Sequence, residues 1–157
     1  MDEDHRDDGD VDEQFRSLME GLRTTLPGVQ LIAAFLLTLP LYDRFEDLAR
    51  QERVAYYLAF GSALVSSLLL MAPSSHQRVR AHRGSVARHS RHHLLVAVRL
   101  TVVGSVLFAL ALTASAFLVS SLVLGTPTAI VVTTVVGAVG AWSWFYLPLV
   151  SFGRDNG

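Results

Sequence analysis

Four long apolar segments constrain the fold of this chain more than any other feature. They cover residues 26–42, 54–72, 100–124 and 128–149, and none of them contains a charged residue. Each is about the length that a helix needs to cross a hydrocarbon core roughly 30 Å thick. Open strands would leave backbone groups unsatisfied in lipid. The sequence therefore predicts an all-α, polytopic membrane protein with four transmembrane helices in an antiparallel bundle.

The segments outside these spans differ in composition. Residues 1–13 are densely acidic and hold almost no apolar side chain, which predicts a disordered arm. Residues 14–25 carry apolar side chains at helical spacing, which predicts a short amphipathic helix. This helix either lies in the membrane interface or extends the first span into water, and the extension is favoured. Residues 26–152 form the predicted transmembrane domain, and 153–157 form a polar tail.

The segment between the second and third spans, residues 73–93, decides the predicted orientation. It contains five basic residues and no acidic one: Arg78, Arg80, Arg83, Arg88 and Arg91. Loops rich in arginine stay on the cytoplasmic side and attract anionic headgroups by about 1 kcal/mol per residue. With four spans, both termini share that side. We therefore predict a multi-pass protein of the cytoplasmic (inner) membrane, with the 73–93 loop and both termini in the cytoplasm.

The same loop holds five histidines, and His89 with His92 or His93 has spacing that could place two imidazoles on one metal ion. No carboxylate or cysteine joins them, and the arginines would repel a cation. A pH-dependent surface charge is a milder alternative. We therefore predict no metal and no cofactor. The loop also lacks aromatic residues for base stacking, so we predict no nucleic-acid partner. The acidic arm, on the same side, is a hypothetical internal partner of this loop.

A few polar residues lie near the predicted spans and are candidate functional residues: Glu20, Arg23, Gln30, Asp43 and Arg99. Starting the third span after Arg99 places its side chain at the cytoplasmic boundary, where it can snorkel or pair with Glu20. Gln30 sits about one turn into the first span, where its amide needs a hydrogen-bond partner. We interpret it as a structural interhelical contact rather than a substrate site.

Small residues at helical spacing indicate where the helices pack. They are Gly61 in the second span, Thr101, Ser105, Ala109 and Thr113 in the third, and Gly137 and Ala141 in the fourth. Small side chains let membrane helices approach closely. The Gly125-Thr126-Pro127 sequence predicts a tight turn that makes the third and fourth spans an antiparallel hairpin. A small external helix is predicted between the first and second spans, at residues 43–53.

Two stretches carry a resemblance to a known family: GLRTTLPGVQLIAAFLLTLPLYDRF at residues 21–45 and LLLMAPSSHQRVR at residues 68–80. They resemble a family of small bacterial four-span membrane proteins of unknown function, some of which carry the label sodium:proton antiporter. The most specific parts are the Gly28-Val29-Gln30 sequence and Ala72-Pro73 followed by His76. The resemblance implies the same four-helix architecture and supplies no catalytic residues.

The function classes follow from what the spans lack. The chain has no cysteine, and no paired carboxylates or glycine-rich phosphate loop are present, so we predict no enzyme. No span contains an Asp or Glu, which weighs against proton-coupled transport. The sequence favours a self-associating structural or accessory membrane component, partnered by the lipid bilayer and by itself or another membrane protein. The alternative is a small oligomeric ion channel or cation:proton transporter.

Overall fold

The computed structural model describes residues 2–81 and 91–146, and within these ranges it contains helices and no strand. Four of the helices are long: α1 (Asp2–Thr38), α2 (Arg50–Ala81), α3 (Arg91–Leu124) and α4 (Thr126–Ala141). Each contributes a segment long and apolar enough to cross a membrane, namely Arg16–Leu41, Arg50–Pro73, Leu95–Leu124 and Thr126–Trp144. The all-α fold with four potential spans is confirmed, and the pattern is that of a multi-pass membrane protein.

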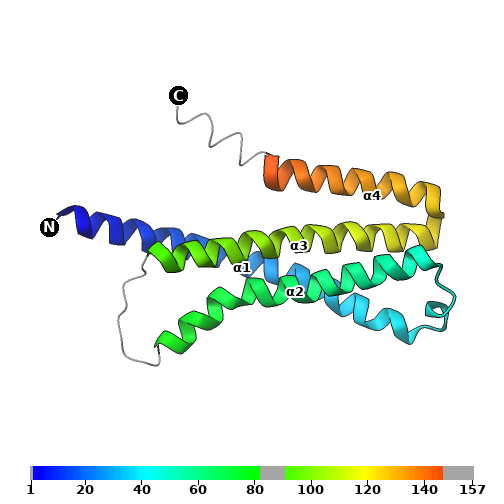
Figure 1. Ribbon diagram of the computed structural model, residues 1–157, viewed down its shortest axis with the longest axis horizontal. Helices are drawn as coiled ribbons and strands as arrows, with labels where there is room; N and C mark the ends of the chain where they lie inside the picture. Colours follow the sequence, from blue (N-terminus) through cyan, green and yellow to red (C-terminus); the bar gives the residue numbers. More distant parts are fainter. Residues whose placement is uncertain (1, 82–90, 147–157) are drawn as a thin grey trace.

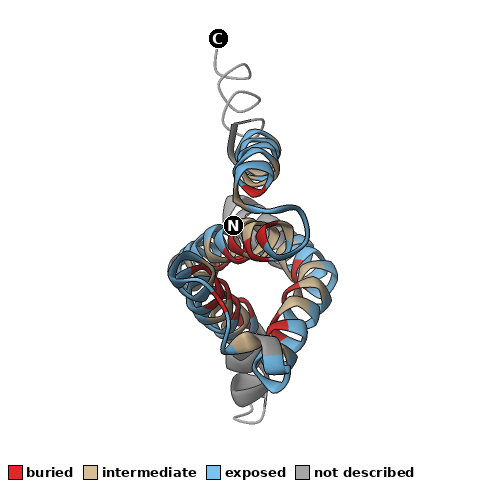
Figure 2. Cartoon of the chain, turned by 90° about the vertical axis from the view of Figure 1, so that its right-hand side faces the viewer, coloured by how far each residue is buried: buried red, intermediate tan, exposed pale blue. Residues whose placement is uncertain are grey.

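The four helices run up and down along the long axis of the molecule (Figure 1). The start of α1, the end of α2 and the start of α3 lie at one end, the α1–α2 connection and the α3–α4 turn lie at the other, and α4 runs back from that turn along part of α3. Helices α1, α2 and α3 all pack on one another, whereas α4 packs on α3 and, among the described residues, is joined to α2 by a side-chain hydrogen bond at its start. Viewed along the axis, α4 lies outside the group formed by the other three (Figure 2).

Helix α1 is continuous from Asp2 to Thr38, where the sequence predicted a disordered arm and a separate amphipathic helix. Adding residues to an existing helix costs less than nucleating one, and acidic residues near the N-terminus interact favourably with the helix dipole. In the 14–25 segment, Leu18 and Met19 pack against Ala97 of α3. This segment therefore continues the first span, which was the favoured of the two interpretations.

The connection between α1 and α2 begins earlier in the chain and is less helical than predicted. Helix α1 ends before Pro40 and gives way to the 3₁₀ turns η1 (Leu39–Leu41) and η2 (Asp43–Phe45). The predicted small helix at 43–53 is wrong, because α2 already begins at Arg50. A carboxylate oxygen of Glu52 accepts a hydrogen bond from the backbone N–H of Ala49 at 2.9 Å, which caps this start.

The connection between α2 and α3 is shorter than the predicted 73–93 loop. Helix α2 continues through the buried Pro73 to Ala81, and α3 begins at Arg91. A proline inside a helix removes one backbone hydrogen bond, which is tolerated in membrane helices whose neighbours satisfy the freed group. The predicted second span, 54–72, agrees with the apolar segment Arg50–Pro73, and the helix continues beyond it into the polar stretch.

The turn between α3 and α4 is as predicted. Gly125 has φ 84° and ψ 162°, a backbone conformation that side-chain-bearing residues rarely adopt, and it separates Leu124 from Thr126. Its N–H donates to the carbonyl of Ser121 at 3.1 Å, and its own carbonyl accepts from Ala129 at 3.1 Å. Helices α3 and α4 are therefore an antiparallel hairpin joined by a single residue.

The core lies between α1, α2 and α3, where buried residues recur at steps of three, four or seven. They are Leu22, Val29, Ala33 and Leu36 on α1, Tyr56, Ala59, Ala63, Ser66 and Leu70 on α2, and Gly104, Phe108, Ala111, Ala114 and Leu118 on α3. Steps of three and four keep one stripe of each helix facing its neighbours, as in coiled coils. Three alanines, Ala33, Ala63 and Ala111, meet where the three helices come together.

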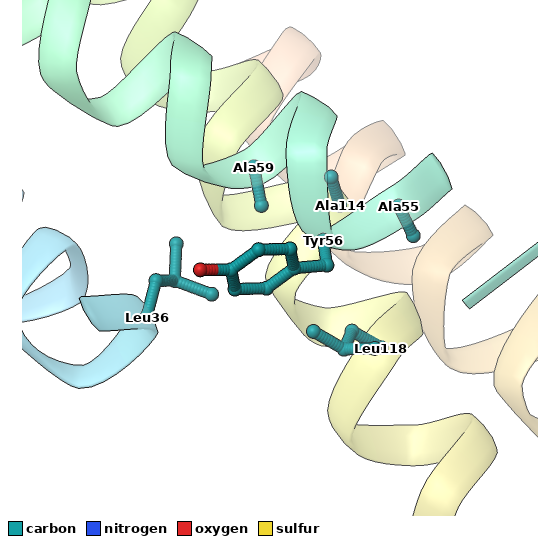
Figure 3. Close-up of a cluster of buried hydrophobic side chains, with 6 residues drawn as sticks. All are labelled: Leu36, Ala55, Tyr56, Ala59, Ala114 and Leu118. Carbon is teal, nitrogen blue, oxygen red and sulfur yellow. The ribbon is translucent and has the colours of Figure 1, made fainter. Parts of the chain in front are cut away.

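The end of this core next to the α1–α2 connection is built around one aromatic side chain. Tyr56 of α2 lies among Leu36, Ala59 and Leu118, with its ring directed toward α1 (Figure 3). Its ring centroid is 4.9 Å from that of Phe45, edge to face, so the turn η2 is packed onto the same cluster. The small residues around the ring make the space that it fills.

Candidate functional site

Helices α2 and α3 make the most extensive contact among the described helices, and this contact contains a buried polar link. The Ser66 hydroxyl donates a hydrogen bond of 2.7 Å to the backbone carbonyl of Gly104. A β-carbon at Gly104 would lie 2.8 Å from Cδ2 of Leu70, so only glycine fits here without a shift. Sequence reasoning missed Gly104, although it lies seven residues from both Ala97 and Ala111 on one small-residue face.

The small residue predicted for packing on α2 lies elsewhere. Gly61 is exposed, and a β-carbon added to it would meet nothing within 4 Å. The neighbouring Ser62 and Ser66 are buried instead. The correct face of α2 is therefore one residue further around the helix, because small residues occur on both faces and spacing alone does not choose between them.

The predicted stripe on α3 lies beside the core face, not within it. Thr101, Ser105, Ala109 and Thr113 are all partly buried. A β-carbon at Gly137 of α4 would lie 3.5 Å from Cγ2 of Thr113, so the stripe and the predicted small pair on α4 meet at this point. Ala141, the other member of that pair, is exposed. Thr113 of the stripe therefore lies in the α3–α4 contact, and the buried face of α3 that holds Gly104 and Ala111 packs on α1 and α2.

The hydroxyls along these helices mostly satisfy themselves within their own helix. Thr101 donates to the carbonyl of Ala97 at 2.9 Å, and Thr113 to that of Ala109 at 2.8 Å. Two others differ: the buried hydroxyl oxygens of Ser115 and Thr133 have no hydrogen-bond partner. These two were not singled out from the sequence, where they look like any other hydroxyl in an apolar run.

The five candidate polar residues do not converge on one site. Glu20, Arg23, Gln30, Asp43 and Arg99 are all exposed. No ion pair joins Arg99 to Glu20 among the described residues, although the packing of Leu18 and Met19 on Ala97 brings the two residues to a similar level along the bundle. The amide of Gln30 makes no hydrogen bond to another described residue.

The predicted topogenic arginines and the histidines weighed as metal ligands lie in and around the α2–α3 connection. The side chains of Arg78, Arg80, Arg83, Arg88 and Arg91, and of the loop histidines, lie outside those that the structure describes. Within the described residues no group of three or more His, Cys, Asp or Glu side chains could hold a metal ion. The proposed contact between the acidic arm and this loop also lies outside them.

One polar contact joins the start of α2 to the start of α4. The side-chain amide of Gln51, at the start of α2, donates to the hydroxyl of Thr126, at the start of α4, at 3.0 Å. Arg53 also donates from Nη2 to the carbonyl of Glu46 at 3.1 Å, which fixes the preceding turn. These contacts hold backbone and helix ends in place, and they do not form an acid–base or nucleophile arrangement.

A comparison with known families gives one match: the model of DUF6328, described as a family of unknown function, matches residues 4–148. The match includes the acidic segment from Asp4 onward, in addition to the two stretches that carry the resemblance. The resemblance to an uncharacterised family is confirmed. No curated protein and no solved structure matches the chain.

Proposed function

Because the chain belongs to the DUF6328 family, whose function is unknown, we propose a role from its own surface: it is a non-enzymatic, self-associating structural or accessory component of the cytoplasmic membrane. The observation that carries this proposal is how little one chain buries. The buried share of the span residues is 39% in α2, 28% in α3, 17% in α1 and 6% in α4. A single copy therefore encloses almost no interior in which a substrate could be held.

The placement of the polar residues also supports a role without catalysis or coupled transport. From Val54 to Arg154 the sequence contains no Asp or Glu, so α3, α4 and the part of α2 beyond its first turn carry no carboxylate that could exchange protons inside a membrane. The candidate polar residues lie on outer surfaces and at helix ends. Such positions suit contacts with headgroups or with other chains.

The proposal includes an orientation, with both termini and the α2–α3 connection in the cytoplasm. It is supported by the arginines of the 73–93 region, against which the opposite end has Arg44, Arg50 and Arg53. Reporter fusions at residue 1 and residue 157 should both report from the cytoplasm. Reports from opposite sides would contradict an even number of spans.

The decisive experiment measures oligomeric state and ion flux on the same purified protein. We expect light scattering in mild detergent to give a multiple of 17.2 kDa after the detergent is subtracted. We also expect proteoliposomes of wild type to conduct no more Na⁺, K⁺ or H⁺ than empty vesicles. A monomer in both detergent and lipid would overturn the self-association. Specific flux that is lost in Arg99→Ala or Gln30→Ala would instead establish the channel or transporter alternative.

A further inference from the structure

Gln30 lies on the outer side of α1, away from the three-helix core. Its neighbours Val29 and Ala33 are buried, whereas Gln30 itself, Pro27 and Ala34 are exposed. Residues three and four apart share one face of a helix, so these three exposed residues form a single outward face. Apart from Gln30, this face is apolar.

The depth of Gln30 makes its exposure consequential. The stretch of α1 and η1 between Arg23 and Asp43 contains no charged residue, and at 1.5 Å per residue it spans about 30 Å, the thickness of a hydrocarbon core. Gln30 lies seven residues beyond Arg23 and four beyond Leu26, where the predicted first span begins, which puts it about 6–10 Å into that layer. Its side chain is too short to reach the headgroups over this distance, unlike the long side chain of an arginine.

An amide at this depth needs a protein partner. It presents two N–H donors and a carbonyl acceptor, and lipid tails offer neither a donor nor an acceptor. No hydrogen bond joins Gln30 to another described residue of its own chain. The exposed apolar residues of α4, such as Val131 and Val139, are different, because lipid covers them without any unsatisfied group.

We propose that Gln30 pairs with Gln30 of a second copy of this chain, so that two α1 helices meet side by side. This inference rests on the proposed self-association and assigns its interface. A two-fold axis along the membrane normal brings equivalent residues of parallel helices opposite each other. The amide is self-complementary, since each carbonyl can accept from the other N–H₂ group. Ala34, one turn further along, is small enough to let the two helices approach closely.

Cross-linking in the membrane tests this arrangement, since the chain has no cysteine of its own. Ala34→Cys puts a thiol on the proposed interface, and Phe35→Cys puts one at nearly the same depth but about 100° around the helix. Both positions are exposed. With a mild oxidant in native membranes, we expect Ala34→Cys to form a disulfide-linked dimer and Phe35→Cys to remain mostly monomeric. Equal cross-linking at both positions, or none at Ala34, would overturn the interface.

The amide itself is tested by substitution. Gln30→Leu removes the polar group, and Gln30→Asn keeps it on a side chain one methylene shorter. By fluorescence energy transfer between labelled copies in bilayers, we expect Gln30→Leu to raise the dimer dissociation constant about 3- to 30-fold. We expect Gln30→Asn to recover most of that loss and helix content to be unchanged in both.

The outcomes separate this inference from the proposed function. If Gln30→Leu associates as tightly as wild type, the Gln30 interface is wrong and self-association through another face stands. If wild type is itself monomeric in bilayers, both ideas fail. If Gln30→Leu and Gln30→Asn weaken association equally, shape rather than the amide governs the contact, and the proposed hydrogen bond is wrong.

Discussion

Helices α1, α2 and α3 bury part of their apolar surface against one another, whereas α4 leaves most of its apolar surface exposed. Along α2, Ala59, Ala63 and Leu70 are completely buried, and each faces another helix. Along α4 the one buried residue among those described is Ala129, next to the turn. Val131, Val135 and Val139 of α4 are all more than half exposed. One group of helices has an interior, and the other helix is attached to it by a single side.

The difference shows what selects the inward face of a helix when the surroundings are also apolar. Lipid tails accept leucine as readily as a protein interior does, so apolarity does not distinguish the two sides. The close approach of two helices does distinguish the two sides. It depends on small residues at the right spacing and on the hydrogen bond from Ser66 to Gly104. Helix α4 meets α3 at Gly137, and its valines Val131, Val135 and Val139 face outward.

The largest effect that would test this contrast is expected from Gly104→Val. A β-carbon at this position already lies 2.8 and 2.9 Å from two atoms of the fully buried Leu70, and valine adds two further methyl groups. Overpacking of a close contact costs about 1–3 kcal/mol, and we expect the upper end of that range. The measurement is unfolding by SDS titrated into mild detergent micelles.

The matched control for Gly104→Val is Gly61→Val, on the open side of the neighbouring helix. A β-carbon there meets nothing within 4 Å, so its unfolding midpoint should be that of wild type. If the two valine variants are destabilised equally, a general intolerance of glycine replacement would explain the result and the close α2–α3 contact would lose its support.

The second prediction concerns the volume that a buried side chain fills, and not how closely two helices approach. Leu36 is completely buried against Tyr56 and Leu118, whereas the next residue, Leu37, is 56% exposed. In lipid the transfer term largely disappears, so Leu36→Ala should cost mainly the cavity that it leaves, about 2 kcal/mol. Leu37→Ala removes the same atoms from the outer surface and should cost little in the same SDS titration. If Leu37→Ala cost more stability than Leu36→Ala, the buried face of α1 would have been assigned to the wrong side of the helix.

The sequence predicted the spans well because their lengths and lack of charge follow directly from the properties of a bilayer. It also predicted the Gly125 turn, where the chain reversal leaves few alternatives. It did not identify Gly104 or the alanine cluster of Ala33, Ala63 and Ala111. Several faces of each helix carry small residues, so choosing the packed one requires knowing which helices are neighbours.

Candidate site residues were less predictable for a related reason. The sequence placed Gln30 in a span and required a partner for its amide, which is a sound physical requirement. It did not show whether that partner belongs to the same chain, because this depends on the rotation of α1 about its axis. The buried Val29 and Ala33 fix that rotation and leave Gln30 outside.

The third effect isolates one hydrogen bond. Ser66→Ala removes the donor to the Gly104 carbonyl, a contact of 2.7 Å between two helices. Hydrogen bonds of this kind contribute about 0.6 kcal/mol on average in membrane proteins and at most about 1.7, so we expect a loss within that range. Thr134→Val is the control, because its hydroxyl bonds the carbonyl of Ile130 in its own helix α4. A loss from Thr134→Val that matched Ser66→Ala would remove the distinction between the two helices.

The smallest effect tests how α4 is held at its outer end. Gln51 donates to Thr126 at 3.0 Å, and both lie on the exposed surface where water competes, so Gln51→Ala should change global stability by only about 0.5 kcal/mol or less. Its effect should be local, seen as faster hydrogen exchange of the first backbone amides of α4. Thr126→Val should do the same, and the double variant should be no worse than either, because both remove one contact. Fully additive effects would mean that the two side chains act independently and that the one-residue turn at Gly125, with the Thr113–Gly137 contact, holds α4 without this link.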